Sequence, residues 1–215
     1  MEFVLLGWPP DEVTLRLDYR RFAYAGKFVV GSTGKAVVRD PTAANAAEGA
    51  SAADGDPDEY DDDVLAAASF SPDRTDADCL CIRYVTARAD RRGEGLGSRL
   101  LAFVAARAEA RGYDRVRIAV NNPLAYQAAY RAGFGFTGRE TGLAELVCER
   151  PGPRDAATYR AGLDRYRDRN LDDGMAAFLA DRRNADPPAV VDPPDGRVAD
   201  RVDERETDAG GEPGS

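Results

Sequence analysis

The pattern of apolar and polar positions predicts one central unit in this chain. Residues Cys79–Ala87 are rich in β-branched and aromatic side chains and end at a charged cluster, which predicts a strand. From Gly97 onward, apolar residues recur at helical spacing until Gly112, which predicts an amphipathic helix. Charged and apolar residues then alternate from 115 to 120, until Asn121-Asn122-Pro123 breaks the pattern. The pattern therefore predicts a strand, a glycine loop, a helix and a second strand.

The same pattern predicts further strands and helices before and after this unit. Short apolar runs predict further strands at residues 2–6, 35–39, 64–70, 135–138 and 143–149. Residues 13–19 alternate as a short strand or an extended arm, and residues 22–28 fit either a helix or a strand. Helical spacing predicts a pair of helices at 157–169 and 171–183. We therefore expect a core at residues 1–153, followed by a helical appendage at 154–183.

Two segments lack the apolar residues that would offset the entropy of ordering. Residues 40–63 hold nine acids and no base, and we expect a mobile hairpin insertion there. Residues 184–215 hold five prolines and nine acids against three arginines, which predicts a disordered acidic tail. Neither segment is expected to contribute to folding.

The loop between the central strand and helix carries Gly93, Gly95 and Gly97. Glycines at a helix N-terminus leave backbone N–H groups uncovered, where the helix dipole favours anions such as phosphate. The alternative is a tight turn that needs glycine only for its dihedral angles. Arginines favour the first interpretation, since residues 80–118 hold nine arginines and four acids in a chain of formal net charge −9. This local positive charge suits a polyanionic ligand.

The spacing of these glycines excludes two common phosphate motifs. No lysine follows them as a P-loop requires, and the loop reads G-x-G-x-G, which differs from the dinucleotide fingerprint. However, Arg92-Gly93-Glu94-Gly95-Leu96-Gly97 resembles the [QR]-x-x-G-x-G signature of the GNAT superfamily of N-acetyltransferases. Residues 122–134 resemble the N-P-x-A…Y…G-F segment of the same family. The resemblance covers roughly residues 64–150.

This resemblance implies a mixed α/β (α+β) fold, in which helices flank a GNAT-like central mixed sheet. It also implies transfer of an acetyl group from acetyl-CoA to a primary amine of an unidentified acceptor. The alternative is a non-catalytic module that binds acyl-CoA for regulation or assembly. The family layout favours a helix at residues 22–28. The residues that the resemblance places against acetyl-CoA are Val85, Thr86 and Ala87 along the pantetheine arm, Arg92, Gly93, Glu94, Gly95, Leu96, Gly97 and Ser98 at the pyrophosphate, and Asn122.

The sequence offers few candidates for the catalytic acid and base. The resemblance makes Tyr130 the candidate general acid for the CoA thiolate, although its position is one residue later than the family's usual spacing. Core packing of Tyr130, with Tyr126 nearer the sulfur, is the alternative. The chain has no histidine, so a carboxylate or water would deprotonate the amine. The carboxylates in the relevant segments are Glu140, Glu145 and Asp78, although the favoured interpretation of each is a surface charge. Tyr24 and Lys27 either line an acceptor pocket or serve in packing and solvation.

The composition indicates the cellular setting and the partners that we expect for this protein. Acids outnumber bases 38 to 29, and Lys27 and Lys35 are the two lysines, a pattern that indicates a halophilic cytoplasm or an acidic protein of a GC-rich genome. The acidic surface argues against nucleic-acid binding. Without histidine, the three cysteines are expected to be reduced thiols and not metal ligands. We expect no membrane partner, because no apolar run approaches 18 residues. The appendage is expected to cover the sheet or to form a homodimer interface.

Overall fold

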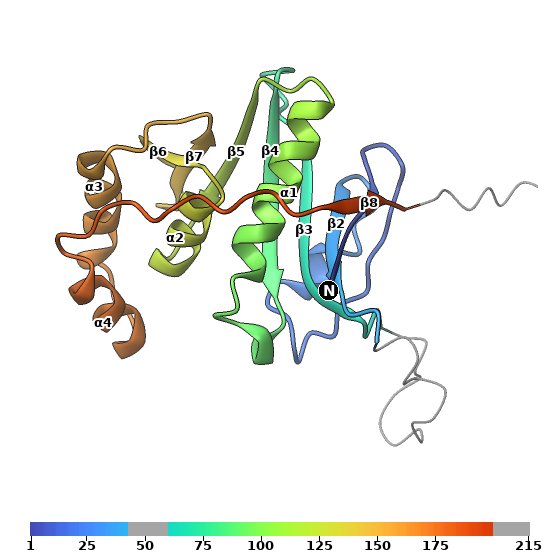
Figure 1. The fold of residues 1–215 in the computed structure, drawn as a ribbon, viewed down its shortest axis with the longest axis horizontal. Helices are drawn as coiled ribbons and strands as arrows, with labels where there is room; N and C mark the ends of the chain where they lie inside the picture. Colours follow the sequence, from blue (N-terminus) through green and yellow to red (C-terminus); the bar gives the residue numbers. More distant parts are fainter. Residues whose placement is uncertain (43–59, 200–215) are drawn as a thin grey trace, which may run out of the picture.

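The computed structural model describes residues 1–42 and 60–199 of the 215-residue chain. Its centre is a mixed sheet with the strand order β6-β7-β5-β4-β3-β2-β1-β8 (Figure 1). The pairs β4–β5 and β1–β8 are parallel, and the other neighbours are antiparallel. The strands are β1 (Glu2–Gly7), β2 (Gly34–Arg39), β3 (Val64–Pro72), β4 (Cys79–Ala87), β5 (Arg115–Val120), β6 (Gly135–Glu140), β7 (Leu146–Arg150) and β8 (Gly196–Val198). The predicted mixed α/β fold with a central mixed sheet is confirmed.

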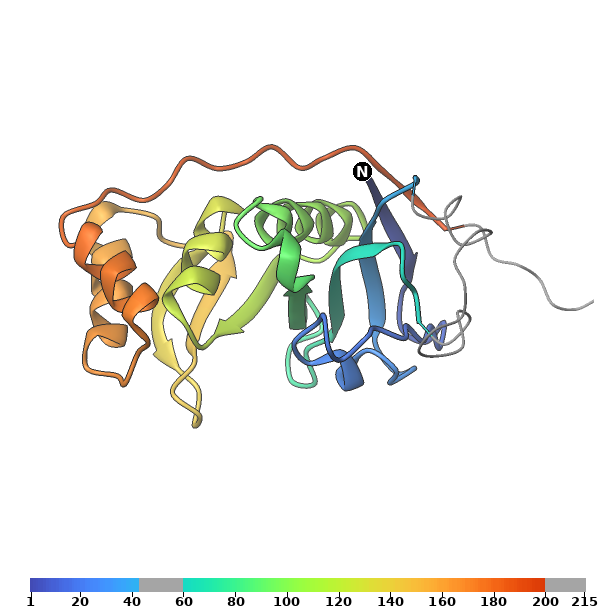
Figure 2. The ribbon, with the colours of Figure 1, turned by 90° about the horizontal axis from the view of Figure 1, so that it is seen from below.

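Alternation along the strands divides the core between the two faces of the sheet. Phe3 and Leu5 of β1 belong to the cluster that packs against the helices, whereas Val4 belongs to a smaller cluster beneath the N-terminal arm. Figure 2 shows α1 on one side of the sheet and the arm on the other. The helices are α1 (Leu96–Ala110), α2 (Pro123–Arg131), α3 (Ala156–Arg167) and α4 (Asp173–Asp181). The predicted strand, glycine loop, helix and strand are confirmed as β4, the loop, α1 and β5.

The N-terminal arm contains less regular structure than the family layout suggested. Residues 13–18 form the extended arm of the two predicted alternatives, with no strand. The helix favoured for residues 22–28 is wrong, because only one 3₁₀ turn, η1 (Ala25–Lys27), forms there. Tyr24 precedes it with a left-handed φ of 61°, which an α-helix cannot continue. Phe22 and Phe28 are buried against the sheet, so hydrophobic packing fixes the arm without a helix.

The C-terminal helices extend the main core of the protein. Tyr159, Leu163 and Tyr166 of α3 are buried in the same cluster as the residues of α1 and α2. The carboxylates of Asp155 and Asp172 accept hydrogen bonds from backbone N–H groups in the first turns of α3 and α4, which caps both helices. The predicted helical pair is therefore present, and α3 covers the β6 end of the sheet.

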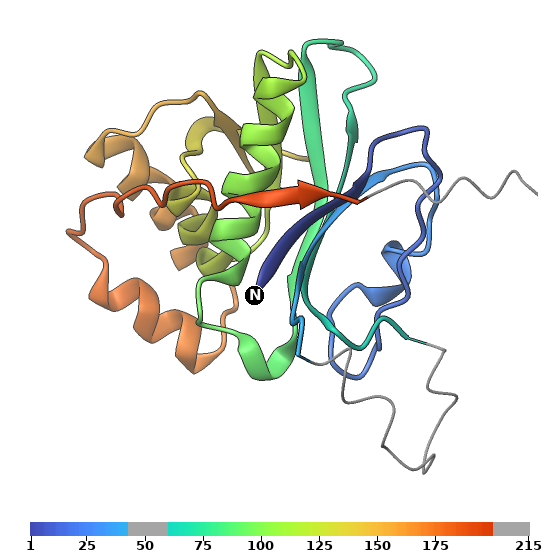
Figure 3. The same ribbon diagram turned by 45° about the vertical axis from the view of Figure 1, so that its right-hand side comes forward.

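The prediction of a disordered tail at residues 184–215 is wrong for residues 184–199. This segment, here called the strap, runs from α4 across α2 and α1 and ends in β8 beside β1 (Figures 1 and 3). The Val191 N–H donates to the Arg131 carbonyl at 2.8 Å, and the guanidinium of Arg154 donates to the carbonyl of Pro188 at 3.1 Å. Composition does not indicate this order, because backbone pairing and the isolated apolar contacts of Ala185 and Val191 with the core hold the strap. Residues 200–215 lie outside the described residues.

Removal of the strap is expected to destabilise the protein, contrary to the expectation from composition. A chain that ends at Arg183 loses the β8 ladder, the hydrogen bonds above and the Arg197–Glu2 ion pair of 2.6 Å. Several hydrogen bonds of about 1 kcal/mol each, partly offset by regained chain entropy, amount to about 3 kcal/mol. We therefore expect the Tm to fall by roughly 6–12 °C in calorimetry. A chain ending at Ala199 keeps these contacts and serves as the control. Equal Tm values for both truncations would contradict a stabilising role.

The predicted insertion at residues 40–63 falls mostly outside the described residues, which resume at Tyr60. Its two ends lie side by side. The Asp40 N–H donates to the Asp63 carbonyl at 2.8 Å, and the guanidinium of Arg39 bonds the Asp63 carboxylate at 2.7 Å. Within residues 1–42 and 60–199, no helix is both long and apolar enough to span a membrane.

Candidate functional site

The candidate site begins where β4 separates from β5. The parallel register between them ends at Ile82 and Ile118, although β4 continues to Ala87. On its other side β4 stays paired with β3, but Ser69 and Phe70 of β3 face Tyr84 and Ile82, so Arg83 forms a β-bulge. A bulge bends its strand and ends pairing. Between residues 83 and 87, β4 therefore has an edge without a strand partner among the described residues.

This open edge leads directly into the glycine loop. Gly93 and Gly95 have φ values of 87° and 78°, which glycine adopts without strain. Gly95 is the N-cap of α1, and no side chain caps this helix. A β-carbon at Gly95 or Gly97 would have no atom within 4 Å. The first N–H groups of α1 are thus uncovered, and the binding of a pyrophosphate by residues 92–98 stays a prediction.

The arginines before the loop differ in their partners. Arg88 pairs with Asp90 at 2.8 Å, and Arg91 pairs with Glu94 at 3.0 Å. Arg92 is exposed and has no ion-pair partner in the part of the chain that the structure describes. Of the three, Arg92 is the one whose charge is available to a ligand at the start of α1.

Tyr130, the predicted general acid, lies in the core. It is fully buried, and its hydroxyl oxygen accepts a hydrogen bond from the Phe136 N–H at 3.0 Å. Its ring packs 4.9 Å from that of Tyr126 and 4.7 Å from that of Tyr159. Tyr126 is equally buried and donates to the carbonyl of Tyr159 at 3.2 Å. Burial raises the pKa of both phenols. These contacts support core packing of Tyr130, and Tyr126, which the alternative placed nearer the sulfur, is packed in the core as well.

Other predicted residues also have structural partners. The side-chain oxygen of Asn122 accepts from the Ala125 N–H at 2.8 Å and caps α2. Glu140 lies in ion pairs with Arg165 and Arg169 at 3.6 and 3.9 Å, and Glu145 accepts from the Thr141 hydroxyl at 3.0 Å. Asp78 is exposed just before the start of β4, at the end opposite the bulge. Asp78 lies away from the open edge, whereas Glu140 and Glu145 lie beside Leu146, which pairs with Val120 at the end of β5.

Tyr24 is a phenol that the structure brings from the N-terminal arm to the gap between β4 and β5. Its ring centroid lies 5.8 Å from that of Tyr84 on β4, and its hydroxyl accepts from the Asn121 side chain at 3.4 Å, just beyond β5. Tyr24 is 52% exposed and has the left-handed φ of 61°. Such strain in a non-glycine residue is typical of functional positions. The sequence singled out Tyr24 but gave no sign that it bridges the two strands.

The cysteines form a compact group on the opposite half of β4. The ligand atoms of Cys79, Cys81 and Asp73 lie within 4.8 Å of one another. The Cys81 thiol donates to the Asp73 carboxylate at 3.2 Å, and Arg117 pairs with the same carboxylate at 2.7 Å. Burial raises the pKa of both thiols, that of Cys81 to about 12. The hydrogen bond of Cys81 and the ion pair of Asp73 fit structural cysteines.

Lys35 lies beneath the arm and predicts a pH dependence of stability. It is fully buried, and its ammonium donates to the carbonyls of Val30 and Thr33, each at 2.8 Å. Burial lowers its pKa to about 8, below the value of about 10.4 in an unfolded chain. Between these values the unfolded state binds more protons, so the Lys35 contribution to stability rises with pH.

The difference in unfolding free energy between wild type and Lys35→Met isolates this effect. Both proteins share the buried thiols, whose raised pKa values lower stability above about pH 8.5. Denaturant titrations from about pH 7 to 9.5 should show the wild type gaining stability relative to the variant above about pH 8. A pH-independent difference would contradict a depressed pKa for Lys35.

One known protein family matches part of this chain. Residues 33–136 match the model of the acetyltransferase (GNAT) family. No curated protein matches the chain. Among solved structures, an N-acetyltransferase from Staphylococcus aureus Mu50 is 17% identical, with a TM-score of 0.40; the match spans 54% of this chain and 66% of that one, which is less than two thirds of its length.

Two further solved structures are similar at the same level. A GCN5-related N-acetyltransferase from Kribbella flavida is 21% identical, with a TM-score of 0.40 over 55% of this chain and 67% of that one. A phosphinothricin acetyltransferase from Sinorhizobium meliloti, in complex with AcCoA, is 15% identical, with a TM-score of 0.41 over 55% and 60%. The family match includes the open β4 edge, the glycine loop and α2. Over residues 33–136, this chain is therefore similar to the acetyltransferase (GNAT) family.

Proposed function

We propose that this protein transfers the acetyl group of acetyl-CoA to a primary amine. The observation that carries the proposal is the continuity between the open edge of β4 and the uncapped N-terminus of α1. Backbone groups of Val85, Thr86 and Ala87 would bind the amide-rich pantetheine arm as a neighbouring strand does. The pyrophosphate would lie against residues 92–98, where N–H groups and Arg92 offer positive charge.

The chemistry requires an amine nitrogen to attack the thioester carbon, so that a C–N bond forms and the C–S bond breaks. The departing thiolate then takes a proton. In our proposal Tyr24 donates this proton, because its hydroxyl lies at the gap in which the β4 edge ends. In this proposal the proton of the amine passes to water.

Two measurements test this function. Calorimetry in molar KCl, which suits the proposed halophilic setting, should detect binding of acetyl-CoA. A thiol-release assay over a panel of amines in the same buffer should then detect free CoA. If acetyl-CoA does not bind, the proposal is wrong.

The burial of Tyr130 favours one alternative, a module that holds acyl-CoA without turning it over. Such a module would bind acetyl-CoA and release no thiol with any amine. The same two measurements therefore separate an enzyme from a binding protein.

A further inference from the structure

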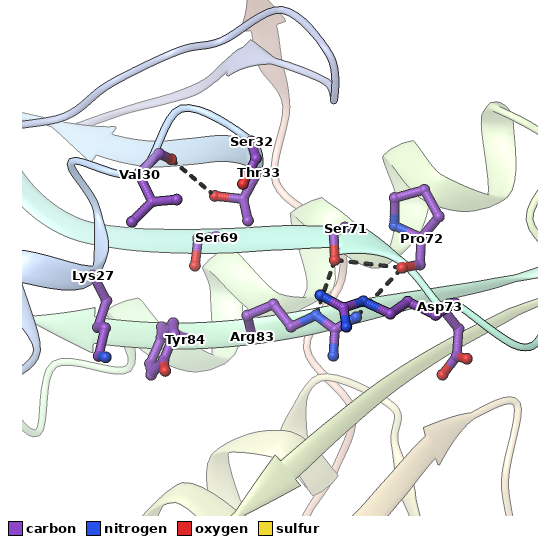
Figure 4. Close-up of a pocket in the computed structure, with 11 residues that line it drawn as sticks. Lys27, Val30, Ser32, Thr33, Ser69, Ser71, Pro72, Asp73, Arg83 and Tyr84 are labelled. Carbon is purple, nitrogen blue, oxygen red and sulfur yellow. Dashed lines mark hydrogen bonds between the residues drawn. The ribbon is translucent and has the colours of Figure 1, made fainter.

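A cavity of about 770 Å³ lies under the N-terminal arm, beside the bulge of β4. The arm contributes Lys27 and Thr33 to its lining, and the sheet contributes Ser69, Arg83 and Tyr84 (Figure 4). Tyr84 also contacts the ring of Tyr24 at the gap between β4 and β5. The cavity therefore opens next to the place where the proposed acetyl transfer would occur, on the side of the sheet away from α1.

The charge of this cavity is opposite to that of the whole chain. Lys27, Arg74 and Arg83 line it, and none of them has a carboxylate partner within residues 1–42 and 60–199. The acid in the lining, Asp73, already pairs with Arg117 at 2.7 Å. Hydrogen bonds from Thr75, and then from Cys81, hold the pKa of Asp73 below its usual range. In a chain of net charge −9, the cavity is a local site of positive potential that attracts anions.

Arg83 is placed to use this charge. Its guanidinium donates to the Ser71 hydroxyl at 2.9 Å and to the Pro72 carbonyl at 3.3 Å (Figure 4). These two contacts orient the planar group but leave other N–H donors of its five unused. A guanidinium fork matches the two oxygens of a carboxylate or phosphate. The bulge that opens the β4 edge thus also presents Arg83 to the cavity.

Ser69 provides an independent sign of a missing ligand. Its hydroxyl is buried, with the side chain 1% exposed, and it has no hydrogen-bond partner in the described structure. A buried polar group without a partner costs about 1–3 kcal/mol. Because Ser69 lines the cavity opposite Tyr84 on β4, a polar ligand there would satisfy its hydroxyl.

We infer that this cavity holds the acceptor, and that the acceptor is a small primary amine carrying an anionic oxyacid group. Arg83 and Lys27 bind the anionic oxygens, Ser69 hydrogen-bonds the same molecule, and its amine faces the gap beside Tyr24. The inference rests on the proposed acetyl transfer and adds the chemical class of the acceptor. Carboxylate and phosphate share this chemistry, and the test separates them.

The test uses pairs of amines that differ in the anionic group. Glycine is compared with glycinamide, and phosphoethanolamine with ethanolamine, in thiol-release assays with acetyl-CoA at one fixed salt concentration. An anion near an amine disfavours deprotonation of that amine. The intrinsic reactivity of the amines therefore favours the member of each pair that lacks the anionic group. We expect kcat/KM to be about 10- to 100-fold higher for the anionic member of at least one pair, the range for a hydrogen bond to a charged group. The pair that shows the preference identifies whether the acceptor carries a carboxylate or a phosphate.

Variants then assign the preference to the cavity. Arg83→Gln should bring the ratio within each pair close to one, and Lys27→Gln, in an exposed turn, gives the same test if Arg83→Gln does not fold. Arg165→Gln, an exposed arginine of α3 outside the cavity, should leave the ratio unchanged. Turnover of neutral and anionic amines at equal rates, or an unchanged ratio in both cavity variants, overturns the inference while the proposed function stands.

A result without thiol release would affect the two proposals differently. It would overturn acetyl transfer as the function. Calorimetry of glycine and phosphoethanolamine with the acetyl-CoA-loaded protein would then test whether the cavity binds anions, independently of acetyl transfer. Binding that Arg83→Gln weakens at least about tenfold supports an anion site in the cavity, and absence of binding for both probes overturns it.

Discussion

Replacing Tyr24 with phenylalanine is expected to lower kcat by about 10²–10⁴, the usual contribution of a positioned general acid. The change removes only the hydroxyl at the gap between β4 and β5. The ring, 52% exposed and in contact with Tyr84, stays in place, so affinity for acetyl-CoA and the Tm should remain close to those of the wild type. Steady-state thiol release with a saturating amine gives kcat, and calorimetry gives the affinity.

Tyr130→Phe is the matched control, because it removes a hydroxyl from the core. The buried Phe136 N–H would lose its acceptor, which costs about 1–3 kcal/mol and lowers the Tm by several degrees. The kcat of the folded protein should not change. The opposite pattern, a large loss of kcat in Tyr130→Phe and none in Tyr24→Phe, would show that the role implied by the family resemblance is correct and that ours is wrong. An assay limited by chemistry, and not by product release, is required for both variants.

Gly97→Val is expected to weaken acetyl-CoA binding about 100-fold or more while leaving the fold intact. A valine side chain at the first turn of α1 would occupy the space that the pyrophosphate needs to reach the N–H groups. Loss of two such contacts, each about 1.5–3 kcal/mol for a charged acceptor, gives this factor. Gly97 is preferable to Gly95, because Gly95 has a φ of 78° and valine there would be strained without any ligand.

The protein itself tolerates a side chain at position 97. No atom lies within 4 Å of a β-carbon there, and valine has a higher helix propensity than glycine. The control is Gly142→Val, in the loop between β6 and β7, where a β-carbon also meets no atom within 4 Å. Both variants should keep the Tm of the wild type, and only Gly97→Val should lose acetyl-CoA affinity in calorimetry. Unchanged affinity in Gly97→Val would show that α1 does not bind the pyrophosphate.

The sequence alone determined the elements whose signals are local. The period of apolar residues located α1, the alternation in residues 115–120 located β5, and the glycine spacing located the start of the helix. These patterns depend on neighbours a few residues apart, so they survive without knowledge of the fold. The resemblance in the loop and at Asn122-Pro123 pointed to the acetyltransferase (GNAT) family, whose model matches residues 33–136.

The tertiary structure decided the features that depend on distant partners. The strap is polar and rich in proline, and its order depends on remote partners such as the edge of β1, the carbonyl of Arg131 and the guanidinium of Arg154. The family resemblance made Tyr130 the candidate general acid, one residue later than the usual spacing, yet α3 supplies Tyr159 and closes the core over it. The bulge at Arg83 exists only as a mismatch with β3, and the proximity of Tyr24 to Asn121 spans 97 residues of chain. Local sequence specifies periodicity and turns, whereas the packing of remote segments decides which side chains reach the site.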